Sequence, residues 1–539
     1  NLSFHAFFHQ VLFSKYNPQS VFKGILEQHT FLPNTLFICC SPVLSFPIHL
    51  LFQKLVSHNL SNSCGIVALE CNPDLVELST EQLSSFEENQ NFSFLSINEP
   101  IALLHFFEKQ IPGTPLYVGT FRRCVFFNCS ADALTNKNFY RFCNQFLDTY
   151  IAQFWKNRMT LIKLGRLYTR NIFRNIGTTG NSIHKLLPQS LTKIPFVAGA
   201  GTTLDDVIPL LHKYRKNLCI FAVDASLVPL LKHNITPDYV VAVECQLINE
   251  KAFIGAVNSK VPIIADITSR TNILSLTAGN LSLFLSHFSN EPFLERIKKL
   301  SFLSVIIPPL GSVGLAAVEL ALYLKQERDP LFCAGLDFAY PIGTSHCKEA
   351  PSIRNSLDTW SRLSPGGNPS SAYKPLASPI QTQTDEIWTT DPALTGYGKL
   401  FSQRYSTQNN DKTIIYTLSQ KGCNWGIPWA SEKDISECIF SRKNCLEETK
   451  KVSIENYTDE SMSFLQTELD KLLEIKQIFT GKTEASSEKL YALLLDCSYL
   501  YLHFPDGFNG PKLHQDFLNR VRGEIDFFIK DIKKATENL

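Results

Sequence analysis

A repeated alternation of short apolar runs with helical stretches is the feature that most constrains how this chain can fold. The apolar runs of β type are Ile194–Ala198, Leu218–Asp224, Tyr239–Glu244, Val261–Asp266, Leu281–Leu285 and Leu331–Ala334. One helical stretch follows the first run and ends at Tyr214, a second, Ser226 to His233, follows the second run, and a third, Val313 to Lys325, precedes the last run. Strands that alternate with helices wind into a parallel sheet with helices on both faces. We therefore expect an α/β fold with a Rossmann-like central domain.

A smaller α/β domain is expected before this one. Thr35–Cys40, Phe46–Ser57 and Gly65–Glu70 read as strand, crossover helix and strand. Glu70 ends its strand, where an acidic residue of a dinucleotide fold meets a ribose. The turn Ser41-Pro42-Val43 lacks the glycines that let a pyrophosphate approach. A scaffold domain is the favoured interpretation, and a nucleotide site is the alternative.

The rest of the chain is expected to be largely helical. Residues 138–176 have helical periodicity, residues 350–378 are rich in Ser, Pro, Gly and Asn, and three or four helices follow Trp429. The domains expected are 1–135 (α/β), 136–190 (helical connector), 191–430 (Rossmann-like) and 431–539 (helical). Lys163, Arg166, Arg170 and Arg174 recur at three- and four-residue steps, which places four cations on one helix face. That face is either a solvated surface or one that meets phosphate or an acidic partner.

Composition narrows the functional classes. The chain has 51 Lys+Arg against 50 Asp+Glu, a formal net charge of +1, so nothing favours nucleic acid or an anionic membrane. No apolar stretch reaches the roughly 18 residues of a membrane-spanning helix. Most of the 15 cysteines lie in apolar runs without zinc spacing, which favours buried thiols in a reducing cytoplasm and no metal site. We therefore expect a cytoplasmic protein.

Loops that follow strands hold the first group of candidate ligand-binding residues, because ligands of open α/β sheets lie beyond the carboxyl ends of the strands. Gly199 and Gly201 would let the backbone approach a phosphate, and Thr202 and Thr203 would cap the next helix and donate hydroxyls to the same anion. Three carboxylates at strand ends, Asp224, Asp238 and Glu244, are candidates for ribose or base hydrogen bonds or for a metal.

A second group lies further along the chain. Gly311 and Ser312 open a helix and are candidates for a second phosphate or a sugar carboxylate. Gly335 and Asp337 follow the last strand, and His346 lies nine residues beyond Asp337. An imidazole is a suitable base for deprotonating an acceptor hydroxyl. His346 and Asp337 are therefore the candidate catalytic residues: either one acts as the base, or Asp337 orients His346.

Several of these motifs resemble a known family. Gly199 to Asp205, Phe221 to Ser226 and His233 to Asp238 resemble the MptE-like domain of the motility-associated factor (Maf) flagellin glycosyltransferases. The likeness continues in three further blocks, which are Thr160–Arg166 with Arg170-Asn171, Gly335–Tyr340 with His346, and Tyr416–Gly426. It covers about residues 30–430 in the family's order.

The resemblance implies a cytoplasmic glycosyltransferase that moves a nonulosonic acid, of pseudaminic or legionaminic type, from its CMP conjugate to Ser or Thr of flagellin, for flagellar assembly and motility. It implies a sialyltransferase-like fold, no metal or other cofactor, and binding of the nucleotide by the residues above together with Ser226. Flagellin and a sugar nucleotide are the expected partners. The sequence departs from the family at Thr202-Thr203, where Pro-Ser is usual, at Leu336 and at Gln420-Lys421.

Two alternatives stay open. The same likeness extends to 6-hydroxymethylpterin pyrophosphokinases, in which the carboxylates would hold Mg²⁺ for diphosphate transfer from ATP. The departures from the motifs also leave a flagellin-binding protein without catalytic activity. The extra N-terminal domain and the long helical tail favour the transferase over a compact kinase.

Overall fold

A computed structural model describes residues 5–6, 10–181, 183–358, 361–363, 376–406, 415–443 and 454–539. The chain divides into two compact units, Asn1–Gly165 with Tyr501–Lys512, and Arg166–Leu500 with Leu513–Leu539. The boundary falls inside the long helix α6 (Lys137–Ile176). Each unit is described by itself.

The first unit is built on a parallel four-stranded sheet with the order β5-β4-β3-β6. Its strands are β3 (Thr35–Cys40), β4 (Gly65–Glu70), β5 (Phe92–Ser96) and β6 (Arg123–Asn128), and its helices include α1 (Ser20–Gln28), α2 (Phe46–Ser57), α3 (Pro73–Leu83), α4 (Ile101–Glu108) and α5 (Ala131–Thr135). The smaller α/β domain predicted at this end is confirmed. The Glu70 carboxylate is fully buried and accepts hydrogen bonds from Ser41 Oγ (2.9 Å) and Asn72 N (3.0 Å).

The second unit contains an eight-stranded sheet in which every pairing is parallel. In spatial order the strands are β13 (Ile306–Ile307), β12 (Leu281–Ser286), β11 (Ile263–Asp266), β10 (Tyr239–Ala242), β9 (Leu218–Val223), β8 (Ile194–Ala198), β14 (Leu331–Ala334) and β17 (Ile415–Thr417). The predicted Rossmann-like sheet is confirmed. The chain order reverses between β8 and β14, so the topological switch point, where ligands of such sheets bind, lies between these two strands.

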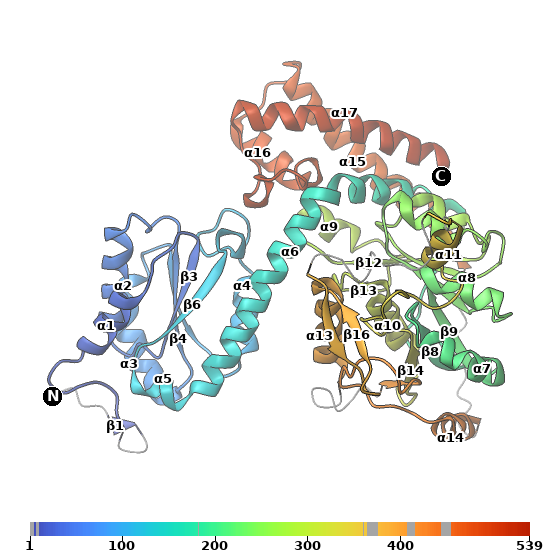
Figure 1. The fold of residues 1–539 in the computed structure, drawn as a ribbon. Helices are drawn as coiled ribbons and strands as arrows, with labels where there is room; N and C mark the ends of the chain where they lie inside the picture. Colours follow the sequence, from blue (N-terminus) through green and yellow to red (C-terminus); the bar gives the residue numbers. More distant parts are fainter. Residues whose placement is uncertain are drawn as a thin grey trace. The chain divides into compact units, whose positions relative to one another are not determined.

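Helices cover both faces of this sheet (Figure 1). Val197 and Phe221 point to the face covered by α10 (Val313–Leu324) and α13 (Pro392–Tyr405). Phe196 and Ile220 point to the opposite face, which is covered by α7 (Leu204–Tyr214) and α8 (Asp224–Lys232). Because both faces are buried, these strands read as continuous apolar runs without polar alternation.

The C-terminal part of the second unit is helical, as the sequence predicts. Its helices are α14 (Glu432–Lys443), α15 (Thr458–Phe479), α16 (Ser487–Asp496) and α17 (Gln515–Asn538). Arg296 ties the short helix α9 (Pro292–Ile297) to α15 through a 2.8 Å ion pair with the buried Glu468. Part of the loop predicted at 350–378 is the helix α11 (Pro351–Asp358), and 359–360 and 364–375 lie outside the described residues.

Two asparagines of α6 hold the loops at the carboxyl ends of β10 and β11. Asn171 Nδ2 donates to the carbonyl oxygens of Cys245 (3.2 Å) and Thr268 (2.9 Å). Asn175 is fully buried, and its Nδ2 donates to the carbonyl oxygens of Ile267 and Ser269, both at 2.8 Å. The C-terminal half of α6 therefore fixes the shape of this edge of the sheet.

The described cysteines, fourteen of the 15 in the sequence, are free thiols, and most are buried, as their apolar context predicts. Among the helices of the described ranges, none has both the length and the hydrophobicity that crossing a bilayer requires.

Replacing Asn175 tests how much the fold depends on the hydrogen bonds from α6 to the loop after β11, which we call the asparagine clamp. In Asn175→Ala two carbonyl oxygens lose their donor and the Thr271 hydroxyl loses its acceptor, which lies 2.6 Å away. We expect the free energy of unfolding of the second unit to fall by about 2–4 kcal/mol, measured by urea denaturation. Asn519→Ala, at an exposed position on α17, is the control and should change it little. Equal stabilities of the two variants would contradict the clamp.

Candidate functional site

The loops that follow β8 and β14 lie directly against each other at the switch point. Gly199 N donates to the Ala334 carbonyl and Gly201 N to the Gly335 carbonyl, both at 2.8 Å. A Cβ on Gly199 would lie 2.2 Å from the Gly335 oxygen, and one on Gly201 would lie 2.3 Å from Asp337 Oδ2. The close approach that these glycines allow is therefore made by the chain's own loop, and not by the predicted phosphate.

Asp337 fills the place predicted for a ligand anion at the start of α7. Its oxygens accept hydrogen bonds from Thr203 N (3.1 Å) and from the Thr203 hydroxyl, which in turn accepts from Gly335 N (2.9 Å). Burial raises the pKa of Asp337 to about 6, and the neighbouring hydroxyls of Thr203 and Thr202 limit the rise. Because these contacts go to the α7 N terminus, Asp337 does not have the predicted role of orienting His346.

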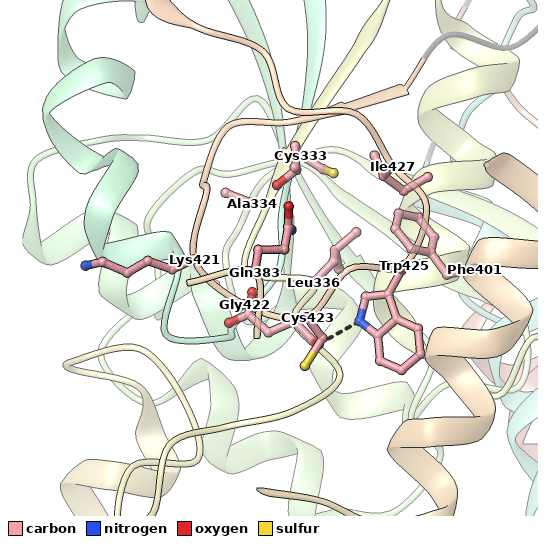
Figure 2. A pocket seen from close by; sticks show the side chains of 12 residues that line it. Cys333, Ala334, Leu336, Gln383, Phe401, Lys421, Gly422, Cys423, Trp425 and Ile427 are labelled. Atoms are coloured by element: carbon pink, nitrogen blue, oxygen red, sulfur yellow. Dashed lines mark hydrogen bonds between the residues drawn. The ribbon is translucent and has the colours of Figure 1, made fainter. Parts of the chain in front are cut away.

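The remaining space at the switch point is small. A cavity of about 30 Å³, room for one water molecule, lies beside the end of β14. Figure 2 shows Gln383, Gly422, Cys423 and Trp425 around it, while Lys421 points away, toward Asp206, with which it forms a 2.9 Å ion pair. Drug-sized ligands occupy pockets of roughly 300–1,000 Å³, so a nucleotide does not fit here in this conformation.

His346 lies in a loop that packs over the start of α7. Cys347 N donates to the Ala200 carbonyl at 2.8 Å, and Lys348 N donates to Asp205 Oδ2 at 3.0 Å. The imidazole Nδ1 is 2.9 Å from Ser345 Oγ and 3.1 Å from Ser352 Oγ. The ring is therefore at the carboxyl edge of the sheet, as predicted, with serine hydroxyls beside Nδ1 where Asp337 was expected.

Two of the predicted nucleotide-binding residues have structural partners. Ser226 is fully buried, and its hydroxyl lies within hydrogen-bond distance of the Ala198 (2.7 Å) and Val223 (3.0 Å) carbonyls. Asp238 forms 2.9 Å ion pairs with Lys193 and Arg215. The prediction for Asp238 is wrong, because this residue precedes β10 and so lies at the amino edge of the parallel sheet, away from the ligand edge.

Asp224 and Glu244 follow the neighbouring strands β9 and β10 at the carboxyl edge of the sheet, as predicted. Both are half-buried; Asp224 accepts a 2.7 Å hydrogen bond from Ala225 N, and Glu244 accepts one of 2.9 Å from Gln246 N. Burial raises the pKa of Asp224 to about 6, and the negative charge of Glu244 adds to the rise. The two carboxylates therefore sense each other's charge.

Two tyrosines that the site prediction did not include lie within electrostatic reach of Glu244. The pKa of Tyr397 on α13 is raised by burial and by the charges of Asp391 and Glu244. The pKa of Tyr168 on α6 is raised by burial and by neighbours that include Glu244 and Tyr397. We call Asp224, Glu244, Tyr168 and Tyr397 the edge cluster. No sequence signal links these tyrosines to the strand ends, because only the fold brings α6 and α13 there.

The N terminus of α10 borders this cluster. Gly311 has a φ of +71° and is exposed, and a Cβ on it would lie 3.1 Å from Tyr397 Cε1. Ser312 is the N-cap residue, and its side chain forms no capping hydrogen bond. Backbone N–H groups at a helix N terminus favour a bound anion, and the edge cluster offers carboxylates for hydroxyl or base hydrogen bonds. Together with phosphate oxygens, Asp224 and Glu244 could also hold a divalent cation.

The central segment of the chain matches a known protein family. Residues 168–343 match the model of a family described as 6-hydroxymethylpterin diphosphokinase MptE-like. This part of the chain is similar to MptE-like domains. The MptE-like domain predicted from the motifs is thereby confirmed, and it includes the edge cluster except Tyr397.

Longer similarities span nearly the whole chain. An uncharacterized protein of Treponema pallidum (strain Nichols) is 29% identical over 555 residues, which cover 98% of this chain and 93% of that protein. The solved structure of the MAf glycosyltransferase from Magnetospirillum magneticum AMB-1 is similar over 96% of this chain and 83% of that one, with 14% identity and a TM-score of 0.46. A structural likeness of this degree assigns no activity to this chain.

Gly201→Ala tests whether the glycine turn serves packing or ligand approach. The added Cβ would collide with Asp337 and the Gly335 carbonyl, so we expect the free energy of unfolding to fall by about 2–3 kcal/mol. Gly396→Ala, on α13 with nothing within 4 Å of the new Cβ, should be neutral or stabilising. A fully stable Gly201→Ala that loses only nucleotide affinity would restore the phosphate interpretation. Urea denaturation and titration with nucleotide measure the two quantities.

Asp224→Asn tests the electrostatics of the edge cluster. The folded-state pKa of Asp224, about 6, lies above the unfolded value of roughly 3.9, so its contribution to stability is present below pH 4 and is lost as pH rises through 6. The variant lacks that loss. Its free energy of unfolding, relative to the wild type, should therefore rise by roughly 1–2 kcal/mol between pH 4 and 6 and then level off. A difference that does not change with pH would show that this carboxyl is not strained.

Proposed function

We propose that the protein is a glycosyltransferase of the Maf type, which transfers a nonulosonic acid from its CMP conjugate to Ser or Thr hydroxyls of flagellin in the cytoplasm. The observation that supports this best is the edge cluster in the MptE-like domain. Two carboxylates at the carboxyl edge of a Rossmann-like sheet, two tyrosines within electrostatic reach of Glu244 and a helix N terminus without a side-chain cap make up this part of the molecule. This set of groups suits a ligand that carries both hydroxyls and an anion.

In the proposed complex, the N–H groups at the start of α10 and the Ser312 hydroxyl bind the phosphate of CMP. Asp224 and Glu244 accept hydrogen bonds from the ribose or cytosine, and Tyr397 closes the side of the site that faces Gly311. The phosphate is then held without a resident metal. Its departure as CMP is assisted by hydrogen bonds, since CMP is a fair leaving group once its charge is stabilised.

The transfer itself is an inverting displacement. The acceptor hydroxyl attacks the anomeric carbon, the bond from that carbon to the phosphate oxygen of CMP breaks, and the hydroxyl proton passes to a base. His346 is the proposed base, because its ring lies at the carboxyl edge of the sheet and Nδ1 is already near the Ser345 and Ser352 hydroxyls. Nε2 would then accept the proton.

The family description supports a second candidate, a pyrophosphokinase that transfers diphosphate from ATP to a hydroxymethylpterin. In that case Asp224 and Glu244 would hold Mg²⁺ on the phosphates. The two candidates differ in the ligand that stabilises the folded protein.

Ligand binding and transfer decide between them. We expect CMP to raise the melting temperature more than ATP with Mg²⁺ does, since a ligand stabilises the state it binds. Flagellin from the same cells, incubated with the protein and the CMP-activated sugar, should gain the mass of one or more sugars. In His346→Ala the single-turnover rate should fall by about 10²–10⁴ with CMP affinity near that of the wild type.

A larger shift with ATP and Mg²⁺, together with flagellin of unchanged mass, would favour the pyrophosphokinase. Ser352→Ala is the matched control for His346, because it removes one hydroxyl beside the ring and leaves the imidazole in place. An unchanged transfer rate in His346→Ala would remove the histidine from the mechanism.

A further inference from the structure

Four cations were predicted on one face of the helix α6: Lys163, Arg166, Arg170 and Arg174. In the structure two of them, Arg166 and Arg174, have carboxylate partners on another helix. Arg166 forms a 2.7 Å ion pair with Glu524, and Arg174 pairs with Asp531, which also accepts a 2.9 Å hydrogen bond from Arg174 Nε. Both carboxylates belong to α17. These two arginines therefore hold α17 on α6 within the second unit, which gives them a structural role.

Arg170 lies between them in the sequence and has no carboxylate partner in the described part of the chain. Its Nε is buried and makes no hydrogen bond. The residue as a whole is partly exposed. Burial lowers the pKa of Arg170, and the positive charges of Arg174, Arg270 and Arg166 lower it further, although Asp531 opposes them. An unpaired guanidinium among like charges costs stability, and a bound anion would relieve that cost.

Arg270 adds a second cation at the same place. It lies in the loop after β11, which Asn175 holds through the Ser269 carbonyl and the Thr271 hydroxyl. Arg270 N donates to the Glu244 carbonyl at 3.1 Å, and its side chain forms a 2.9 Å ion pair with Glu250. Arg270 thus has a carboxylate partner, whereas Arg170 has none in the described part of the chain and feels only the charge of Asp531, which Arg174 already pairs.

The edge cluster lies beside these arginines. Asn171, the residue after Arg170, donates to the Cys245 carbonyl, next to Glu244 in the chain. Tyr168, two residues before Arg170, is within electrostatic reach of Glu244. This stretch of α6 therefore packs on the loops that follow β10 and β11. The Arg170 side chain lies on the helix face of Arg166 and Arg174, beside that packing face, where the charge of Arg270 in the loop after β11 reaches it.

We propose that Arg170, supported by Arg270, is a binding site for an oxyanion of the ligand that occupies the edge cluster, either a phosphate or a carboxylate. The assignment of this anion to the sugar donor rests on the proposed function, because a CMP-activated sugar acid carries both a phosphate and a carboxylate. A guanidinium offers a planar pair of N–H donors that matches either oxyanion. Such a donor has two anionic groups; the α10 N terminus would bind one of them and Arg170 the other.

The test uses the full chain and two simple anions. Sodium phosphate and N-acetylneuraminic acid, a sugar that carries a carboxylate and no phosphate, are each compared with sodium chloride at equal ionic strength, because screening alone changes stability. We expect at least one of them to raise the melting temperature of the wild type by several degrees. In Arg170→Met, which keeps the length of the side chain and removes its charge, that rise should be lost.

Without ligand, Arg170→Met should melt at the wild-type temperature or above it, since it removes an unpaired charge. Arg166→Met is the matched control: it removes a paired cation one turn away and should keep the rise with the anion. A rise with phosphate assigns the site to the nucleotide, and a rise with the sugar acid alone assigns it to the carboxylate. The proposal is overturned if neither anion stabilises the wild type beyond chloride, or if Arg170→Met is stabilised as much as the wild type.

Failure of the transferase proposal would look different. Flagellin of unchanged mass with an anion response that depends on Arg170 would leave this site standing and remove only the donor that we assign to it. Normal sugar transfer by Arg170→Met, with no anion response in the wild type, would leave the transferase and remove the site.

Discussion

The contact between the loops after β8 and β14 is the constraint on which the second unit depends. At a topological switch point the connections that follow two neighbouring parallel strands diverge and open a gap at the carboxyl ends of the strands. Here the Asp337 carboxylate closes that gap on Thr203 at the start of α7. Gly199, Gly201 and Gly335 are required because the two backbones meet at distances that no side chain tolerates. With this gap closed, the open groups lie one strand further along, at the ends of β9 and β10.

The position of the open groups at the ends of β9 and β10, and not at the switch point, explains which parts of the site the sequence predicts. A glycine turn after a strand shows that something approaches the backbone closely, but the sequence does not show whether it is a phosphate or another loop. The acids at strand ends behave differently. Asp224 and Glu244 follow their strands and lie at the carboxyl edge of the sheet, as predicted. Asp238 precedes its strand and lies at the other edge, bound to Lys193 and Arg215. Position before or after a parallel strand is readable from the sequence, and it separates these cases.

The fold was easier to predict than the partners of its side chains. Buried strands such as β8 and β9 are apolar along their whole length and stand out in the sequence. The short strands β13 and β17 do not, because they lie at the margins of the sheet. Tyr397 gains its significance from the packing of α13, so the sequence did not distinguish it from an ordinary helix surface residue. Arg170 was one of four cations predicted on a helix face, but the sequence did not show which of them lacks an acidic partner.

The central claim is that a nucleotide binds at the edge cluster and the α10 N terminus, and that the glycine turn is internal packing. Hydrogen–deuterium exchange of the full chain with and without CMP measures this directly. CMP should slow exchange in residues 308–316, 224–226 and 244–246, and leave 199–204 unchanged, since the amides of Gly199 and Gly201 are already hydrogen-bonded to the β14 loop. Protection confined to 199–204, with no change at the α10 N terminus, would contradict the account.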